Sequence, residues 1–113
     1  MKRYVFFLDL KPSNDLIAAY EKYHNAVWPE IEQQILASGV EHCEIYRCSN
    51  RLVLIVESEM EMDWERKSRL DAEHQPTQEW ENLMWKYQQA LPGFEGQGKW
   101  QMAKKIYELS NKK

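Results

Sequence analysis

Two side chains near the N-terminus have the types and the spacing that acid–base chemistry requires. Tyr20 and His24 stand four residues apart, so a helix places their side chains on one face. Imidazole is the side chain that can donate or accept a proton at neutral pH. Because Pro29 interrupts the helix shortly afterwards, we expect His24 to lie at a helix end that faces a cleft. The alternative is a core or surface histidine whose positive charge suits a helix C-terminus.

Aromatic residues are the outlier of the composition, with five Trp and six Tyr in 113 residues. Aromatic side chains in excess of what a core needs often line a sugar site. Trp80 is predicted near the start of a helix, where its indole and free backbone N–H groups can meet a small polar ligand. Core packing is the alternative for Trp80, and it is the prediction for Trp85. Glu81 offers a carboxylate, but no two acidic residues form an identifiable pair in the sequence.

The motifs of the common cofactors are missing from the sequence. It has no phosphate loop, no Gly-rich dinucleotide fingerprint, no CxxC pair and no GxSxG elbow. Cys43 and Cys48 are the two cysteines, and no histidine pair stands at metal-ligand spacing. We therefore expect free thiols in a reducing compartment. The sequence predicts chemistry without a cofactor or a metal, or no chemistry at all.

Composition and charge describe one globular domain over residues 1–113, with 43% apolar and 29% charged residues. The net charge is −3 with both signs interspersed, which predicts no binding to nucleic acid or to an anionic membrane. The longest apolar stretch, residues 52–56, is far shorter than the roughly 18 residues of a membrane helix. Asp9 interrupts the apolar N-terminal run and no small-residue cleavage site follows, so we expect a cytoplasmic protein.

Three segments have the aromatic and β-branched content of strands: residues 3–10, 40–48 and 51–58. Residues 49–50 form a tight turn between the last two segments, which predicts a hairpin. A final strand is expected over residues 99–109, because its apolar residues fit poorly on a single helical stripe. A helix is the alternative for this last segment.

Helices are predicted on either side of the hairpin. The first begins after an N-cap at Ser13, and Pro29 opens a second, short helix that Gly39 terminates. After a charged segment, Thr77 is the expected N-cap of the last helix, which runs until Pro92. One face of that helix is predicted to carry Trp80, Met84, Tyr87 and Leu91.

The predicted order β-α-β-β-α-β is the α+β, ferredoxin-like arrangement, in which helices cover one face of an antiparallel sheet. The first strand, however, is apolar on both faces, with Tyr4, Phe6, Leu8 and Leu10 on one side and Val5 and Phe7 on the other. A sheet that is apolar on both faces needs a second cover, and no segment of the chain remains to supply it. We therefore expect a homodimer whose two sheets pack face to face.

The segment around His24 resembles the N-terminal motif of the L-rhamnose mutarotase family, Tyr20-x-x-x-His24-Asn25-x-x-Trp28-Pro29-Glu30. Members of that family are small dimeric α+β barrel proteins that interconvert the α and β anomers of 6-deoxy-L-sugars. Nearly the whole chain shares the resemblance, including Gly39, Ile45-Tyr46 and Gln78-Glu79-Trp80. It implies an isomerase with a monosaccharide substrate and no cofactor, in which His24 is the proton donor and Tyr20 contacts the sugar.

Two positions depart from the family pattern. Cys43 stands where the rhamnose enzymes place a sugar-contacting tyrosine, and Glu81 follows Trp80 where they have two adjacent tryptophans. The resemblance thus places Cys43, Trp80 and Glu81 at the sugar, with a wider pocket beside Cys43. Glu81 is also a candidate general base if its carboxylate reaches the cleft of His24. The segment from Gln78 to Trp100 resembles a subgroup associated with L-fucose use, so L-fucose stands ahead of L-rhamnose.

Two other functions remain compatible with these residues. A small cofactor-free monooxygenase on a similar dimeric barrel also uses His, Trp and Tyr in an aromatic pocket, although the Trp28-Pro29-Glu30 context argues against it. A non-catalytic dimeric module could use Tyr20, His24 and Trp80 to bind a small metabolite without accelerating any reaction.

Overall fold

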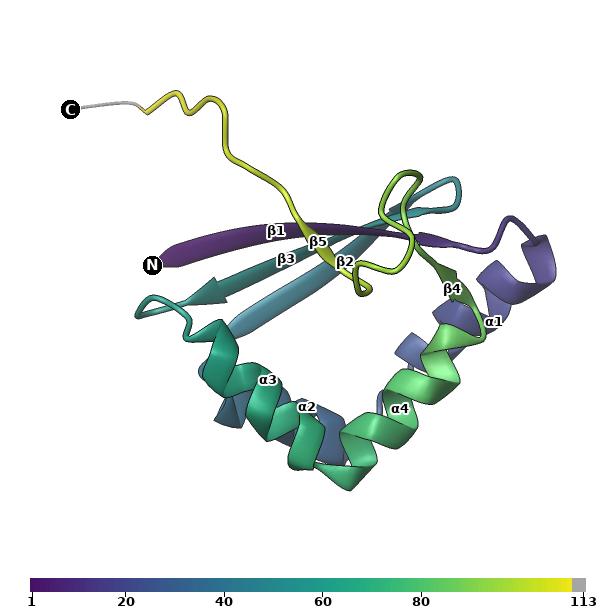
Figure 1. Cartoon of the computed structure of the whole chain (residues 1–113), viewed down its shortest axis with the longest axis horizontal. Coiled ribbons are helices and arrows are strands. Elements are labelled where there is room, and N and C mark those ends of the chain that lie inside the picture. The colour runs from purple at the N-terminus through teal and green to yellow at the C-terminus, as the bar shows by residue number, and fades with distance from the viewer. Residues whose placement is uncertain (111–113) are drawn as a thin grey trace.

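The computed structural model describes residues 1–110. One antiparallel sheet packs against a layer of helices (Figure 1). The elements follow the order β1 (Lys2–Leu10), α1 (Asn14–His24), α2 (Pro29–Ala37), β2 (His42–Cys48), β3 (Arg51–Ser58), α3 (Trp64–Glu73), α4 (Gln75–Trp85), β4 (Gln88–Gln89) and β5 (Gln101–Met102). Within residues 1–110 no helix is long and apolar enough to cross a membrane. The fold class is α+β and ferredoxin-like, which confirms the prediction from the sequence.

The sheet is centred on β1, and its strand order is β2-β3-β1-β4 with β5 also paired to β1. The β1–β3 pairing is antiparallel and runs from Lys2 opposite Ser58 to Asp9 opposite Arg51. β4 pairs with the C-terminal end of β1, and β5 pairs with β1 at Phe6 and Phe7. The fourth strand of the predicted arrangement is thus shared by two short segments along one edge of β1.

The last helix differs from its prediction at both ends. Its N-cap is His74 rather than Thr77, and the His74 imidazole accepts a hydrogen bond from the Thr77 backbone N–H at 3.3 Å. The helix ends at Trp85, so the predicted continuation through Tyr87 to Leu91 is wrong. The helix ends early because Gln88 and Gln89 adopt an extended conformation and pair with the C-terminal end of β1.

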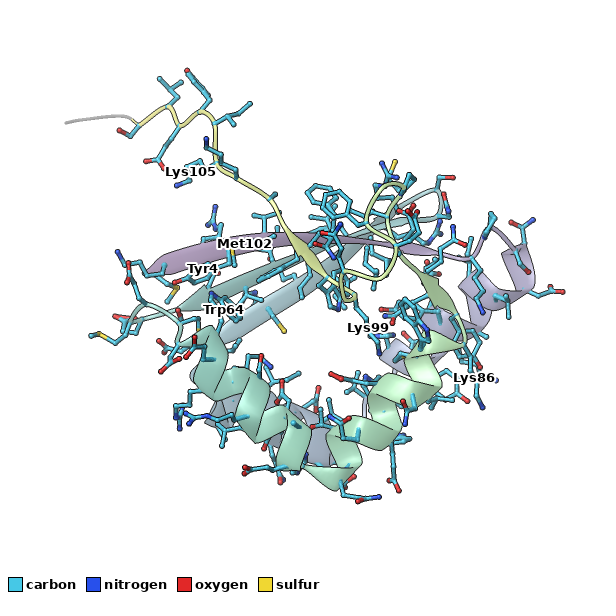
Figure 2. The ribbon with its side chains drawn as sticks, in the orientation of Figure 1. Tyr4, Trp64, Lys86, Lys99, Met102 and Lys105 are labelled. Carbon is cyan, nitrogen blue, oxygen red and sulfur yellow. The ribbon has the colours of Figure 1, made fainter. Side chains whose placement is uncertain are left out.

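Helix α3 arises from the charged segment, where no helix was predicted. Asp63 caps it by accepting a hydrogen bond from the Arg66 backbone N–H at 3.0 Å. None of its residues is buried, so it lacks the apolar stripe by which a helix is recognised in a sequence. Its contact with the sheet is Trp64, whose ring meets Tyr4 and Phe6 edge to face at 5.0 and 5.3 Å (Figure 2).

The predicted strand over residues 99–109 is correct only at Gln101–Met102. The Ala103 N–H still donates to the Val5 carbonyl at 2.7 Å, and residues 103–110 then have no regular structure. This segment leaves the sheet on the side away from the helices (Figure 1), so no neighbouring strand holds it extended. Its apolar side chains are exposed: Ile106, Tyr107 and Leu109.

The core lies between the sheet and the helices, and its buried residues are Leu10, Tyr20, Ile31, Leu52, Trp80 and Met84. Since alternate strand residues point to opposite faces and Leu8, Leu10 and Leu52 are buried in the core, their neighbours face away from the helices. We call this second surface the open face: Val5, Phe7, Tyr46, Val53 and Ile55. β1 is therefore apolar on both faces, as the sequence predicted.

Ion pairs flank the apolar centre of the open face. At one end Asp9 accepts two hydrogen bonds from the Arg51 guanidinium, at 2.8 and 3.1 Å, and the Asp9 side chain is only 5% exposed. At the other end Arg3 donates to the Glu57 carboxylate at 3.0 Å. Both pairs join β1 to β3, so they also fix the register of the two central strands.

Candidate functional site

Helix α1 carries both Tyr20 and His24 and ends at His24. Its N-cap is Ser13, as predicted, whose hydroxyl accepts a hydrogen bond from the Leu16 backbone N–H at 3.4 Å. The rings of Tyr20 and His24 lie 4.3 Å apart between centroids and are tilted by 37°. The structure therefore confirms that the two side chains share one helical face. Tyr20 is buried, whereas His24 is half-buried at the end of the helix.

A backbone contact orients the His24 imidazole. Its Nδ1 lies 2.9 Å from the backbone carbonyl oxygen of Tyr20. A carbonyl can only accept a hydrogen bond, so Nδ1 carries the proton of that contact. The other ring nitrogen, Nε2, is consequently the atom that can gain or lose a proton. The last turn of α1 thus holds His24 as a fixed ring with one chemically available nitrogen.

Helix α4 brings Trp80 against the same face of α1. The Trp80 indole lies 5.7 Å from the His24 ring and 5.0 Å from Trp28, both nearly edge to face. Trp28 is the N-cap residue of α2, so three elements meet at this point. We call Tyr20, His24, Trp28 and Trp80 the aromatic cluster. The sequence grouped three of these residues as candidates, while Trp28 appeared only as part of a motif.

Gln88 extends the cluster through a hydrogen bond that the sequence did not predict. Its side-chain amide donates to the Tyr20 hydroxyl oxygen at 3.3 Å, and Gln88 is only 4% exposed. Burial raises the pKa of Tyr20 to about 12, although the Gln88 hydrogen bond opposes the shift. The phenol therefore keeps its proton at neutral pH, so Tyr20 can orient a ligand but cannot serve as a general base.

Cys43 lies on β2, on the side of the sheet that the helices cover. It pairs with Val56 across the hairpin and is exposed. Desolvation raises the pKa of the Cys43 thiol, and the neighbouring charges that modulate it belong to Lys67, Glu32 and Glu44. Lys67 lies on α3 and Glu32 on α2, so Cys43 faces these two helices. The proposed contact between Cys43 and a sugar stays a prediction.

Glu81 and Trp85 lie on α4 beyond Trp80. The ammonium group of Lys99 donates to the Glu81 backbone carbonyl at 2.9 Å and stands 5.3 Å from the Trp85 ring (Figure 2). Trp85 is 40% exposed, so its prediction as a core residue is wrong. Burial lowers the pKa of Lys99, because this contact partly removes the ammonium from water. The role of the Glu81 carboxylate as sugar contact or base stays a prediction.

Two cavities in the described part of the chain lie away from the aromatic cluster. One, of about 340 Å³, lies between α2 and the loop before α3, and the other, of about 500 Å³, borders the open face near Phe94. Within residues 1–110 no group of three His, Cys, Asp or Glu side chains converges to hold a metal ion. The chemistry of the side chains, rather than a cavity, marks the aromatic cluster as the candidate site.

The sequence profile of L-rhamnose mutarotase matches residues 3–109. The chain belongs to the L-rhamnose mutarotase family. Across 97% of its length the chain is 38% identical to an L-fucose mutarotase of Xanthomonas campestris and covers 90% of that protein. It is also 34% identical over 89 residues to an L-rhamnose mutarotase of Klebsiella pneumoniae, covering 77% of this chain and 76% of that one.

The fold agrees with this family membership. The L-rhamnose mutarotase structure from Formosa agariphila superimposes with a TM-score of 0.71, covering 97% of this chain and all of that one. The sequence identity of the pair is 18%, so the likeness shows the fold alone. The resemblance that began at the motif around His24 is thus confirmed at the level of the family.

We predict that neutral His24 is the Nδ1–H tautomer, because the Tyr20 carbonyl oxygen can only accept a hydrogen bond and Nδ1 must therefore donate it. Nitrogen-15 NMR of the imidazoles at a pH where they are neutral should show a protonated Nδ1 and a bare Nε2. His74 is the internal control with the opposite pattern, since its Nδ1 accepts a hydrogen bond from the Thr77 backbone N–H. Finding Nε2 protonated in neutral His24 would contradict the assigned geometry.

Proposed function

We propose that the protein is an isomerase that interconverts the α and β anomers of a 6-deoxy-L-sugar by opening its pyranose ring. The observation that carries this proposal is the state of His24, with Nδ1 engaged at 2.9 Å and Nε2 left available in an aromatic cluster. Membership of the mutarotase family supports the same reaction. Ring opening requires one proton donor and one proton acceptor, and side chains or water can supply both without a cofactor.

Ring opening transfers two protons and breaks one bond. Protonated His24, which carries a proton on each ring nitrogen, donates the Nε2 proton to the ring oxygen while the bond from that oxygen to C1 breaks. A base removes the proton of the anomeric hydroxyl, and C1 becomes an aldehyde. After rotation about the C1–C2 bond, the C5 hydroxyl that formed from the ring oxygen attacks the other face of the C1 carbonyl. It returns its proton to Nε2 of His24. The base returns its proton to the new anomeric hydroxyl, so no atom is gained or lost.

The neighbouring side chains orient the sugar in this proposal. The Tyr20 phenol, whose pKa burial raises to about 12, hydrogen-bonds a sugar hydroxyl. The Trp80 indole covers the apolar side that carries the C6 methyl group. Cys43 and Glu81 complete the sugar contacts, and water or the Glu81 carboxylate accepts the anomeric proton. Mutarotation also proceeds slowly in water, so acid–base catalysis of about 10²–10⁴-fold with correct orientation is sufficient.

Replacing His24 by Ala should lower the rate of anomer exchange at least about tenfold, because a general acid is lost. Saturation-transfer NMR at the anomeric protons measures the exchange directly, and circular dichroism checks the fold. His42→Ala is the matched control, since His42 is an exposed residue of β2 outside the aromatic cluster. Exchange at the wild-type rate in His24→Ala would make His24 structural, and it would favour a non-catalytic binding module.

We propose L-fucose as the preferred sugar over L-rhamnose. The two sugars differ in which hydroxyl groups are axial, and a site that hydrogen-bonds one arrangement leaves polar groups unpaired with the other. Cys43 removes a phenol and Glu81 adds an acceptor relative to the rhamnose enzymes. The alignment with the L-fucose mutarotase also covers more of the chain, 97%, than the alignment with the L-rhamnose mutarotase of Klebsiella pneumoniae, 77%.

Exchange rates of the two sugars, compared by the same NMR experiment at equal concentration, test this preference. We expect faster exchange with L-fucose, because the altered pocket should pair its hydroxyl groups better. Glu81→Trp, which restores the second tryptophan of the rhamnose enzymes, should shift the ratio of rates toward L-rhamnose. Faster exchange of L-rhamnose by the wild-type protein would contradict the proposal.

We propose that the protein acts as a homodimer formed through the open face. All helices lie on the other side of the sheet (Figure 1), and Tyr46 is 53% exposed at the edge of the open face. The apolar centre between two ion pairs has the composition of an interface, with an apolar core and a polar rim. The exposed apolar side chains of residues 103–110 support a second copy as well.

Light scattering at micromolar concentration should give about twice the 13.6 kDa chain mass. Val53→Lys should shift the protein to the monomer, because it puts a charge in the apolar centre of the open face. Leu36→Lys is the matched control, since Leu36 is 61% exposed on α2 at the other side of the sheet. A wild-type monomer, or equal effects of the two variants, would refute this interface.

The free thiols accord with a cytoplasmic location, which we propose on that ground. Cys43 and Cys48 are both free and exposed. Their spacing of five along β2 puts them on opposite faces of the strand, so they cannot form a disulfide with each other. Exposed unpaired thiols persist in a reducing compartment.

A further inference from the structure

Gln88 is a buried amide with more hydrogen-bonding capacity than its surroundings use. The residue is 4% exposed and lies in β4, opposite Leu10 of β1. Its amide nitrogen donates to the Tyr20 hydroxyl at 3.3 Å. Its carbonyl oxygen, Oε1, is the buried side-chain polar atom that lacks a partner in the described residues. Proteins pair nearly all such atoms, so an unpaired one calls for a physical explanation.

Gln88 keeps one unpaired polar atom whichever way its amide is turned. In the opposite orientation Oε1 accepts a hydrogen bond from the Tyr20 hydroxyl, and the amide nitrogen then loses its partner. One polar end of Gln88 is unsatisfied in either case. A ligand hydroxyl is a donor and an acceptor at once, so it matches the free end of the amide in both orientations.

The position of Gln88 connects this unsatisfied group to the reacting site. Its partner Tyr20 stacks on His24 at 4.3 Å between ring centroids, and His24 meets Trp80 at 5.7 Å. In the proposed function, a sugar with its ring oxygen at His24 Nε2 lies on the face of α1 that Tyr20 shares with His24. Gln88 and Tyr20 together then provide two hydrogen-bonding side chains that fit one arrangement of the sugar hydroxyl groups.

We infer that Gln88 binds a ring hydroxyl of the sugar and, with Tyr20, orients the pyranose against His24. The inference rests on the proposed function, in which the aromatic cluster is the sugar site. Gln88 contacts the substrate before and during ring opening, so its contribution is mainly to binding. Its loss should therefore raise KM with little change in kcat.

The variant Gln88→Met tests this role, because methionine fills a similar volume without an amide. We expect KM for anomer exchange to rise about tenfold and kcat to change less than about threefold. Gln89→Met is the matched control, since Gln89 is the adjacent residue of β4 and points to the opposite face of the sheet. Circular dichroism checks the fold of each variant, and Gln88→Leu replaces Gln88→Met if that variant does not fold.

Deoxy sugars identify the hydroxyl in the same experiment. Analogues of L-fucose that lack the hydroxyl at C2, C3 or C4 are compared in the wild-type protein and in Gln88→Met. For one analogue the wild-type KM should rise about tenfold, because a buried polar group is left unpaired. Gln88→Met should show no further rise with that same analogue, since it already lacks the contact.

A binding measurement separates this inference from the proposed function. The methyl glycoside of L-fucose cannot open its ring, so an NMR titration of it reports binding alone. A tenfold weaker affinity of Gln88→Met, with Gln89→Met unchanged, supports the role of Gln88 even if the wild-type protein does not catalyse exchange. Unchanged KM and affinity in Gln88→Met would overturn the inference and leave water as the partner of Oε1. A wild-type protein that binds no sugar would overturn both proposals.

Discussion

The pairing of β4 with the end of β1 is the constraint on which the candidate site depends. Gln88 and Gln89 align with Leu10 and Asp9, and the Lys11 N–H donates to the Tyr87 carbonyl at 2.8 Å. These hydrogen bonds end α4 at Trp85 and hold the chain that follows it against β1. The helix is thereby fixed with Trp80 beside His24, and Gln88 is buried beneath Tyr20. This short ladder thus places Gln88 beside Tyr20.

Polar groups in the aromatic cluster are controlled by burial and by backbone contacts. The Tyr20 carbonyl determines which nitrogen of neutral His24 carries the proton, and burial raises the pKa of the Tyr20 phenol to about 12. Hydrogen bonds of this kind are stronger away from water, and unpaired groups there are more costly. A site of this type favours a ligand that brings its own hydroxyl groups, and the sugars of the mutarotase family have that property.

The sheet imposes a second constraint, because its helices lie on one side (Figure 1). The open face is apolar in its centre, and the Asp9–Arg51 and Arg3–Glu57 pairs flank it. In the proposed homodimer the two open faces cover each other, and each aromatic cluster remains on the helical side of its own sheet. In that proposal assembly and chemistry use opposite faces of the same sheet, so a substitution on one face tests one of the two proposals.

The sequence by itself determined the features that depend on near neighbours in the chain. Ser13 and Pro29 mark helix starts through their own hydroxyl and ring, and the i, i+4 spacing aligned Tyr20 with His24. Only the tertiary structure decided where α4 ends, that α3 forms without a buried face, and that residues 103–110 leave the sheet. The bond from Gln88 to Tyr20 spans 68 residues, so no local pattern encodes it. Such contacts exist only because β1 offers an edge that competes with the intrinsic preference of the segment.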